Sequence, residues 1–119
     1  MIYTLNAHEQ FTILSIEKTS LTEAEWATIH EALMQLIMEQ RSCLLNGEHV
    51  VHLDVKIVDS LMSLHDEFYA NNLSFVLCSF DKIDKQVLHA DKIQIAPTEI
   101  EGIDIICMEV IERELLDGE

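Results

Sequence analysis

The sequence LSFVLCS, residues 73–79, is the strongest indication of the fold because it is a nearly continuous run of apolar side chains. A strand with one face in water alternates apolar and polar residues, whereas a strand covered on both faces is apolar throughout. The run is therefore predicted to be a strand at or near the centre of a mainly parallel sheet. Phe75 and Val76 point to opposite faces of such a strand, so both are expected to be buried.

Outward from this strand, extended and helical patterns alternate along the chain. The helices are indicated by apolar residues at helical spacing. Two capping boxes, Ser20–Glu23 and Thr98–Glu101, mark helix starts, since a hydroxyl and a carboxylate three residues apart satisfy free amides there. The predicted strands are residues 2–5, 11–16, 50–55, 73–79 and 92–96, and the predicted helices are residues 20–41, 59–71, 81–89 and 97–116.

This order of elements predicts an α/β fold. Strands that alternate with helices are joined by right-handed crossovers, which produce a mainly parallel sheet flanked by helices. The first strand pairs with the second as an N-terminal antiparallel hairpin and lies at an edge. We expect a single domain over residues 1–119 with about four helices.

The charge of the chain limits the classes of partner. The 119 residues include 22 acidic and 7 basic ones, which gives a net charge of −15. Such a field repels phosphate backbones and anionic lipid headgroups. Nucleic acid and membrane surfaces are therefore excluded as expected partners, and a protein with a basic surface is favoured. A homodimer stays open.

The start of the chain and its cysteines predict a cytoplasmic protein. The sequence MIYTLNAHEQ, residues 1–10, has neither the basic nor the apolar segment of a signal peptide. No apolar run approaches the about 18 residues of a membrane span. Cys43, Cys78 and Cys107 are an odd number without metal-ligand spacing, and they are predicted to be reduced thiols.

The sequence contains no catalytic motif. His52 and Asp54 share one face of the predicted strand and form the single candidate pair for a metal or acid–base site, although an ordinary strand-end pair is the favoured interpretation. The three glycines are isolated, so no phosphate-binding loop is present. We therefore predict no enzyme activity, no cofactor and no metal. A receiver domain with Asp54 as phospho-acceptor is a disfavoured alternative.

The stretch from Val50 to about Leu115 resembles the STAS family, the sulfate transporter and anti-sigma-factor antagonist domains. The features that carry this resemblance are the sequences HVVHLDV and LSFVLCS, the short helix DKIDKQVLHAD, the strand KIQIA, and Pro97-Thr98 with Glu101 opening the last helix. The chain departs from the family's Asp-Ser-Ser-Gly phospho-switch, since Val58-Asp59-Ser60-Leu61 has neither the second serine nor the glycine.

The resemblance implies a non-enzymatic protein-interaction module, such as an anti-sigma-factor antagonist or a related regulatory protein. It implies a partner-binding rim at Asp54, Asp59, Ser60 and Leu61, and it makes Ser60 the candidate phosphosite. Asp59 or Ser60 is otherwise expected to be the N-cap of its helix. The alternative function is a small-ligand or nucleotide-sensing domain that binds beyond the strand ends, near Asp54, Ser79 and Pro97.

Overall fold

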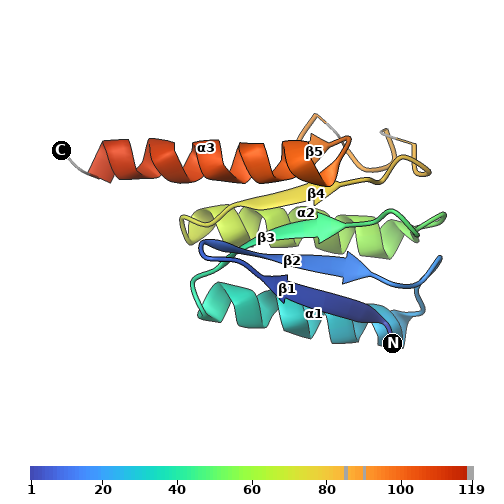
Figure 1. Cartoon of the computed structure of the whole chain (residues 1–119). Helices are drawn as coiled ribbons and strands as arrows, with labels where there is room; N and C mark the ends of the chain where they lie inside the picture. The colour runs from blue at the N-terminus through green and yellow to red at the C-terminus, as the bar shows by residue number, and fades with distance from the viewer. Residues whose placement is uncertain (85, 90, 118–119) are drawn as a thin grey trace.

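Five strands and three helices form the part of the chain that the computed structural model describes, residues 1–84, 86–89 and 91–117 (Figure 1). The hairpin comes first, and helices then alternate with strands. The elements are β1 (Tyr3–Ala7), β2 (Phe11–Ile16), α1 (Glu23–Met38), β3 (Ser42–Asn46), α2 (Val55–Ala70), β4 (Phe75–Cys78), β5 (Ile95–Ala96) and α3 (Glu99–Asp117).

The strands lie in the sheet in their order along the chain, β1-β2-β3-β4-β5. β1 pairs with β2 antiparallel, and the other three pairs are parallel. The predicted α/β class, the N-terminal hairpin and the edge position of β1 are confirmed. β3 is the central strand and β4 is its neighbour. Phe75 and Val76 are both fully buried, as the apolar run requires.

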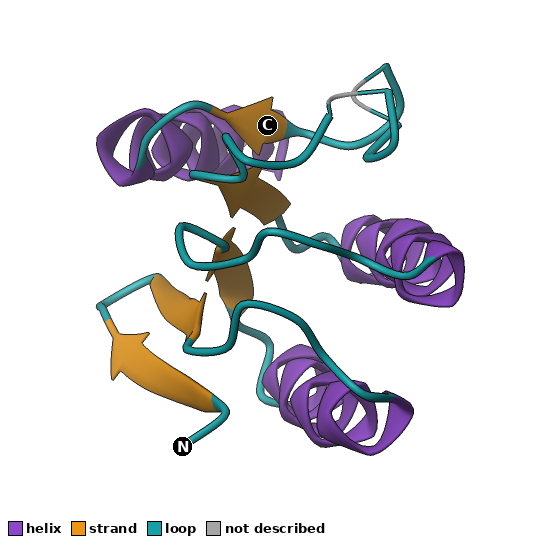
Figure 2. Ribbon diagram, turned by 90° about the vertical axis from the view of Figure 1, so that its right-hand side faces the viewer, coloured by secondary structure: helices purple, strands orange, loops and turns teal. Residues whose placement is uncertain are grey.

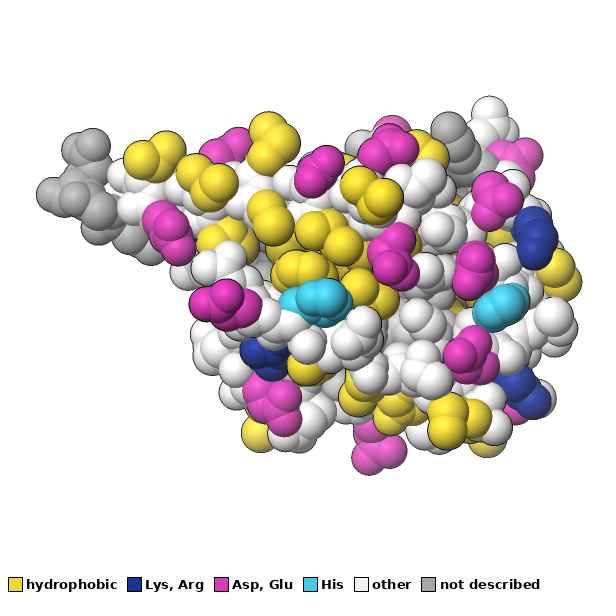
Figure 3. All heavy atoms as spheres, viewed as in Figure 1, with side chains coloured by type: hydrophobic (Ala, Val, Ile, Leu, Met, Phe, Trp, Pro, Cys, Tyr) yellow, Lys and Arg dark blue, Asp and Glu magenta, His cyan; other side chains and the backbone are white. Residues whose placement is uncertain are grey.

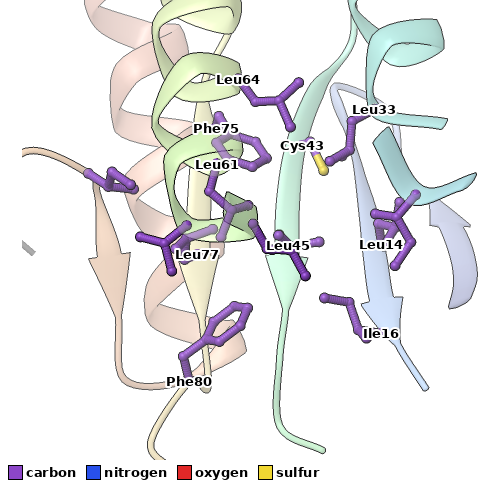
Figure 4. Close-up of a cluster of buried hydrophobic side chains, with 14 of the residues drawn as sticks. Leu14, Ile16, Leu33, Cys43, Leu45, Leu61, Leu64, Phe75, Leu77 and Phe80 are labelled. Atoms are coloured by element: carbon purple, nitrogen blue, oxygen red, sulfur yellow. The ribbon is translucent and has the colours of Figure 1, made fainter. Parts of the chain in front are cut away.

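Helices cover both faces of the sheet. Figure 2 shows α1 and α2 on one face and α3 on the other. The larger core lies between the sheet and the first two helices, and its side chains interlock as Figure 4 shows. The smaller core lies under α3, where Ile106 packs with Phe11, Leu44 and Val76. Burial of apolar surface in these two layers is the main force that holds the fold together.

The central strand lies earlier than predicted. The sequence predicts residues 50–55 as the strand, but β3 is Ser42–Asn46 and every one of its residues is buried. α1 ends sooner than expected because Gln40 adopts a left-handed conformation, with φ of 60°. The amide of Arg41 then bonds the carbonyl of Leu36, which closes the helix without the glycine that commonly marks such an end.

The starts of the first two helices also differ from the prediction. The capping box of α1 is Thr22 with Glu25, not Ser20 with Glu23. α2 begins at Val55, and its N-cap is Asp54, whose carboxylate accepts from the Lys56 amide at 3.1 Å. Residues 50–55 therefore form the approach to α2 rather than a strand.

The predicted short helix at residues 81–89 is wrong for the described part of that segment. Residues 81–84 and 86–89 form turns, and Lys85 lies outside the described residues. Ile83 and Leu88 are buried there without forming a helical stripe. The described residues thus contain three helices rather than about four. β5 is also shorter than predicted, because its register with β4 covers only Ile95 and Ala96.

A polar cluster fixes α3 against the other elements. The carboxylate of Glu109 accepts a hydrogen bond from Tyr69 at 2.7 Å and another from Ser74. Arg113 donates to Ser74 at 2.9 Å, and its guanidinium lies 3.8 Å from the Glu109 carboxylate. Burial, followed by the hydrogen bond to Glu109, raises the pKa of Tyr69. The cluster joins α3 to the end of α2 and the start of β4.

Because two cysteine thiols are buried, the protein is expected to become less stable at alkaline pH. Burial raises the pKa of Cys78 from 9.0 to about 12 and raises that of Cys43 as well. The unfolded chain loses these thiol protons at lower pH than the folded chain, so their contribution is complete below about pH 9. We expect the urea midpoint to fall as pH rises from 9 towards 12, and to fall less steeply in Cys78→Ala. Equal slopes in the two proteins would contradict this prediction.

Candidate functional site

The carboxyl ends of the parallel strands and the N-termini of all three helices meet at one edge of the molecule, at the right of Figure 1. In open α/β sheets this edge is where ligands and partners commonly bind. Residues 47–54 form the loop between β3 and α2 here. Val50 and Leu53 anchor the loop in the core, while Val51 and His52 are exposed.

An exposed patch of apolar and acidic side chains surrounds the start of α2. Val51 is 53% exposed and Val55 is 71% exposed, and in the sequence they precede and follow Asp54, which is also exposed. Asp59 is exposed one helical turn after Val55, on the same face. We call Val51, Asp54, Val55 and Asp59 the α2 rim. Its two valines are exposed apolar surface, and its two carboxylates carry negative charge.

A cleft of about 460 Å³ lies beside the α2 rim, between the N-termini of α1 and α2. Trp26 and Ile57 supply apolar lining, and the exposed pair of Lys56 and Glu23 spans the two helices with 3.5 Å between nitrogen and oxygen. Because Glu23 and Asp54 both line this cleft, its charge opposes anions, although two helix N-termini are close by.

Two of the residues implied for the binding rim belong to the interior. Leu61 is 1% exposed and packs in the larger core, as Figure 4 shows. Ser60 is half-buried in the second turn of α2, and its hydroxyl accepts a 3.1 Å hydrogen bond from the Trp26 indole. Ser60 is therefore not at the helix start, and a phosphate there would displace this bond between α1 and α2. Asp54 and Asp59 are exposed, as the interpretation requires.

The candidate pair of His52 and Asp54 has a different geometry from the one expected. Both residues precede α2 in the loop, and Asp54 caps the helix. Their shared strand face does not exist, since no strand forms at residues 50–55. Within residues 1–84, 86–89 and 91–117, no group of three or more His, Cys, Asp or Glu side chains has a metal-binding arrangement.

A second cavity, of about 370 Å³, lies at the ends of β4 and β5. Phe80, Ile83, Leu88 and Ile95 provide an apolar lining, and Pro97 is at its border with Asp81. Ring atoms of Phe80 lie within 2.6 Å of where a β-carbon on Gly47 would be, so this glycine lets the ring pack there. The sequence analysis named Ser79 and Pro97 at this edge, and Pro97 lines the cavity, but it did not name the apolar residues that form most of the lining.

Comparisons with models of protein families and with curated proteins find no match to this sequence. Among the described helices, none combines the length and the apolar character that crossing a membrane requires.

The sequence interpretation missed Trp26, Val51 and Val55 as members of this edge. The pattern assigned Trp26 to the core face of a helix and the two valines to a strand. Only the valines carried a detectable signal, since they stand beside Asp54 in a segment where the capping preference of aspartate predicts a helix start.

Proposed function

We propose that this chain is a non-enzymatic protein-interaction module that binds a basic partner through the α2 rim. The observation that carries the proposal is the exposure of Val51 and Val55, which precede and follow the exposed Asp54 in the sequence. The net charge of −15 supports a basic partner, because opposite charge speeds encounter. The resemblance to STAS domains, including anti-sigma-factor antagonists, agrees with such a role. Phosphorylation of Ser60 is not part of the proposal, since its hydroxyl is engaged with Trp26.

The test is site-specific photo-cross-linking in the cell of origin. A photoreactive amino acid at Val55 is expected to capture a partner, which is then identified and purified. Met38 is the matched control position, since it is 76% exposed and lies at the end of α1, away from the α2 rim. Capture of the same protein with equal yield from Met38 would contradict the proposal.

Variants of the rim then measure its role with the purified partner. Val55→Ser and Asp59→Asn are each expected to weaken binding several-fold, and affinity should fall as salt rises because exposed charges are screened. Both side chains are exposed, so the thermal midpoint should change little. Leu61→Ala is the control for an effect on stability. Loss of this buried leucine should lower the free energy of unfolding by about 2–5 kcal/mol, whereas the rim variants should leave it nearly unchanged. If both rim variants bind the partner with wild-type affinity, the α2 rim is not the binding surface.

The alternative is a small-ligand sensor. The observation in its favour is the apolar cavity formed by Phe80, Ile83, Leu88 and Ile95, which has the size and lining of a small-molecule site. The two functions are separated by Ile95→Trp, which fills the cavity without touching the α2 rim. A sensor would lose its ligand response in this variant, whereas the proposed module would keep its partner.

A further inference from the structure

A second exposed apolar surface lies on the other side of the sheet, along α3. Five of the eleven large apolar side chains recorded as exposed among the described residues belong to this helix. With 100° of rotation per residue, most of them fall on one side of it together with two half-buried neighbours. We call this set the α3 stripe, and its members are Ile100, Ile103, Cys107, Met108, Ile111 and Leu115.

Most of the stripe lies outside the core of this chain, and Ile103 at its edge packs against the smaller core. Its members Ile100, Met108, Ile111 and Leu115 are between 54% and 74% exposed. α3 packs on the sheet through a different side, which carries Gly102 and Ile106. The C-terminal half of α3 extends past the ends of the strands (Figure 1), and apolar side chains gather along it and beneath it in Figure 3. Exposed apolar side chains gathered along one side of a helix indicate an interaction site.

The charges on α3 determine what kind of partner fits. The helix carries seven acidic residues and one arginine, and Arg113 is already engaged with Ser74. By the helical rotation, Asp104 and Glu114 lie within the arc of the stripe. Glu101 and Glu112 are exposed and border it on one side. A second copy of α3 would bring these carboxylates against their equivalents without a free cation on this helix. A partner helix with an apolar face bordered by Lys or Arg would instead pair with them.

We propose that the α3 stripe is a docking site for a basic amphipathic helix of another protein. Ile100 and Leu115 are 15 residues apart, which is about 22 Å along the helix axis, so a partner helix of about four turns would cover the stripe. The apolar side chains supply the affinity, and Glu101 and Glu112 at the border of the stripe select for a basic flank. The surface is on the opposite sheet face from α2, so this inference does not depend on the α2 rim.

The probe is a synthetic peptide of about 18 residues with leucine at positions i, i+3, i+4 and i+7 and lysine at the flanking positions. One control peptide has the same composition with its leucines scattered around the helix, and another has glutamate in place of lysine. The first peptide is expected to bind the full chain with a Kd tighter than about 1 mM, and each control peptide about tenfold or more weakly. Equal binding of all three peptides, or of none, would overturn the inference.

Variants locate the site. Ile111→Ser combined with Leu115→Ser removes two apolar contacts, and we expect at least about tenfold weaker peptide binding. Leu116→Ser is the matched control, since Leu116 is 76% exposed on the same helix but points away from the stripe. It makes one of the same leucine-to-serine changes in the last turns of the helix and should bind as wild type. Loss of binding in Leu116→Ser to the same extent as in the double variant would overturn the inference.

Cys107 provides an independent readout within the stripe. Its thiol is half-buried, whereas Cys43 and Cys78 are fully buried, so a thiol reagent should modify Cys107 first. Bound peptide is expected to slow this modification several-fold. Sedimentation tests whether a second copy of the chain occupies the stripe, and vesicle binding tests whether a membrane does. A dimer that the double variant abolishes would overturn the inference in favour of a second copy, and stripe-dependent binding to phosphatidylcholine vesicles would overturn it in favour of a membrane.

Discussion

Replacing Phe75 with alanine is expected to lower the free energy of unfolding by about 3–5 kcal/mol. The Phe75 ring is fully buried in β4 and stacks on the ring of Phe68 in α2, with 4.8 Å between centroids and 17° between planes. Figure 4 shows it among the leucines of the larger core. Its removal leaves a cavity beneath α2 and breaks the aromatic pair. Urea denaturation followed by circular dichroism measures the loss.

Because a small domain is stable by only about 5–15 kcal/mol, Phe75→Ala by itself risks leaving too little folded protein for measurement. Phe75→Leu keeps most of the volume and should cost less than about 2 kcal/mol. Combined with Phe68→Leu, it gives a double-mutant cycle whose coupling energy should be about 0.5–1.5 kcal/mol. Additive effects, with no coupling, would contradict the stacking described here.

Replacing Glu109 with alanine is expected to cost about 2–4 kcal/mol, because several groups would lose their partner together. The Tyr69 hydroxyl and the Ser74 hydroxyl both donate to this carboxylate, and Arg113 would keep its charge with no carboxylate beside it. Side chains of Glu109 and Arg113 are 19% and 24% exposed, which places the cost below that of a fully buried pair. Chemical denaturation of the two proteins measures the difference.

Glu109→Gln is the matched control, since its amide oxygen still accepts from Tyr69 and Ser74 while the attraction to Arg113 is lost. It should cost about 1 kcal/mol, less than the alanine variant. Tyr69→Phe removes one donor and should cost a similar amount. If Glu109→Ala and Glu109→Gln are equally stable, the hydrogen bonds to Tyr69 and Ser74 contribute nothing, and the account of how α3 is fixed is wrong.

The elements that were predicted correctly are those whose sequence signals lie within a few residues of one another. The apolar run at residues 73–79 and the alternation of helices and strands led to the observed α/β class and the hairpin. The start of α3 was found as well, because the Thr98 hydroxyl accepts from the Glu101 amide at 3.3 Å, within a single turn. Signals of this kind depend on residues close in sequence, so the sequence contains them in full.

The central strand was misplaced for a reason that the sequence does not show. The pattern HVVHLDV looks extended, while SCLLN follows directly after a helix with no glycine between them. The backbone ends α1 with a left-handed Gln40, which glutamine adopts rarely, so the end of the helix could not be predicted. Because β3 is Ser42–Asn46 rather than residues 50–55, Asp54 is a helix cap, and the predicted helix start at Asp59 lies inside α2.

Local sequence patterns were sufficient to predict the fold class and the burial of Phe75 and Val76 in β4, and composition fixes the net charge of −15. Which side chains are exposed depends on tertiary packing. Leu61 and Val55 are both apolar residues of α2, yet one is in the core and the other is 71% exposed. Exposure depends on which elements pack together across the chain, and that packing is set by many distant contacts acting at once. The α2 rim and the α3 stripe could therefore be recognised only in the folded molecule.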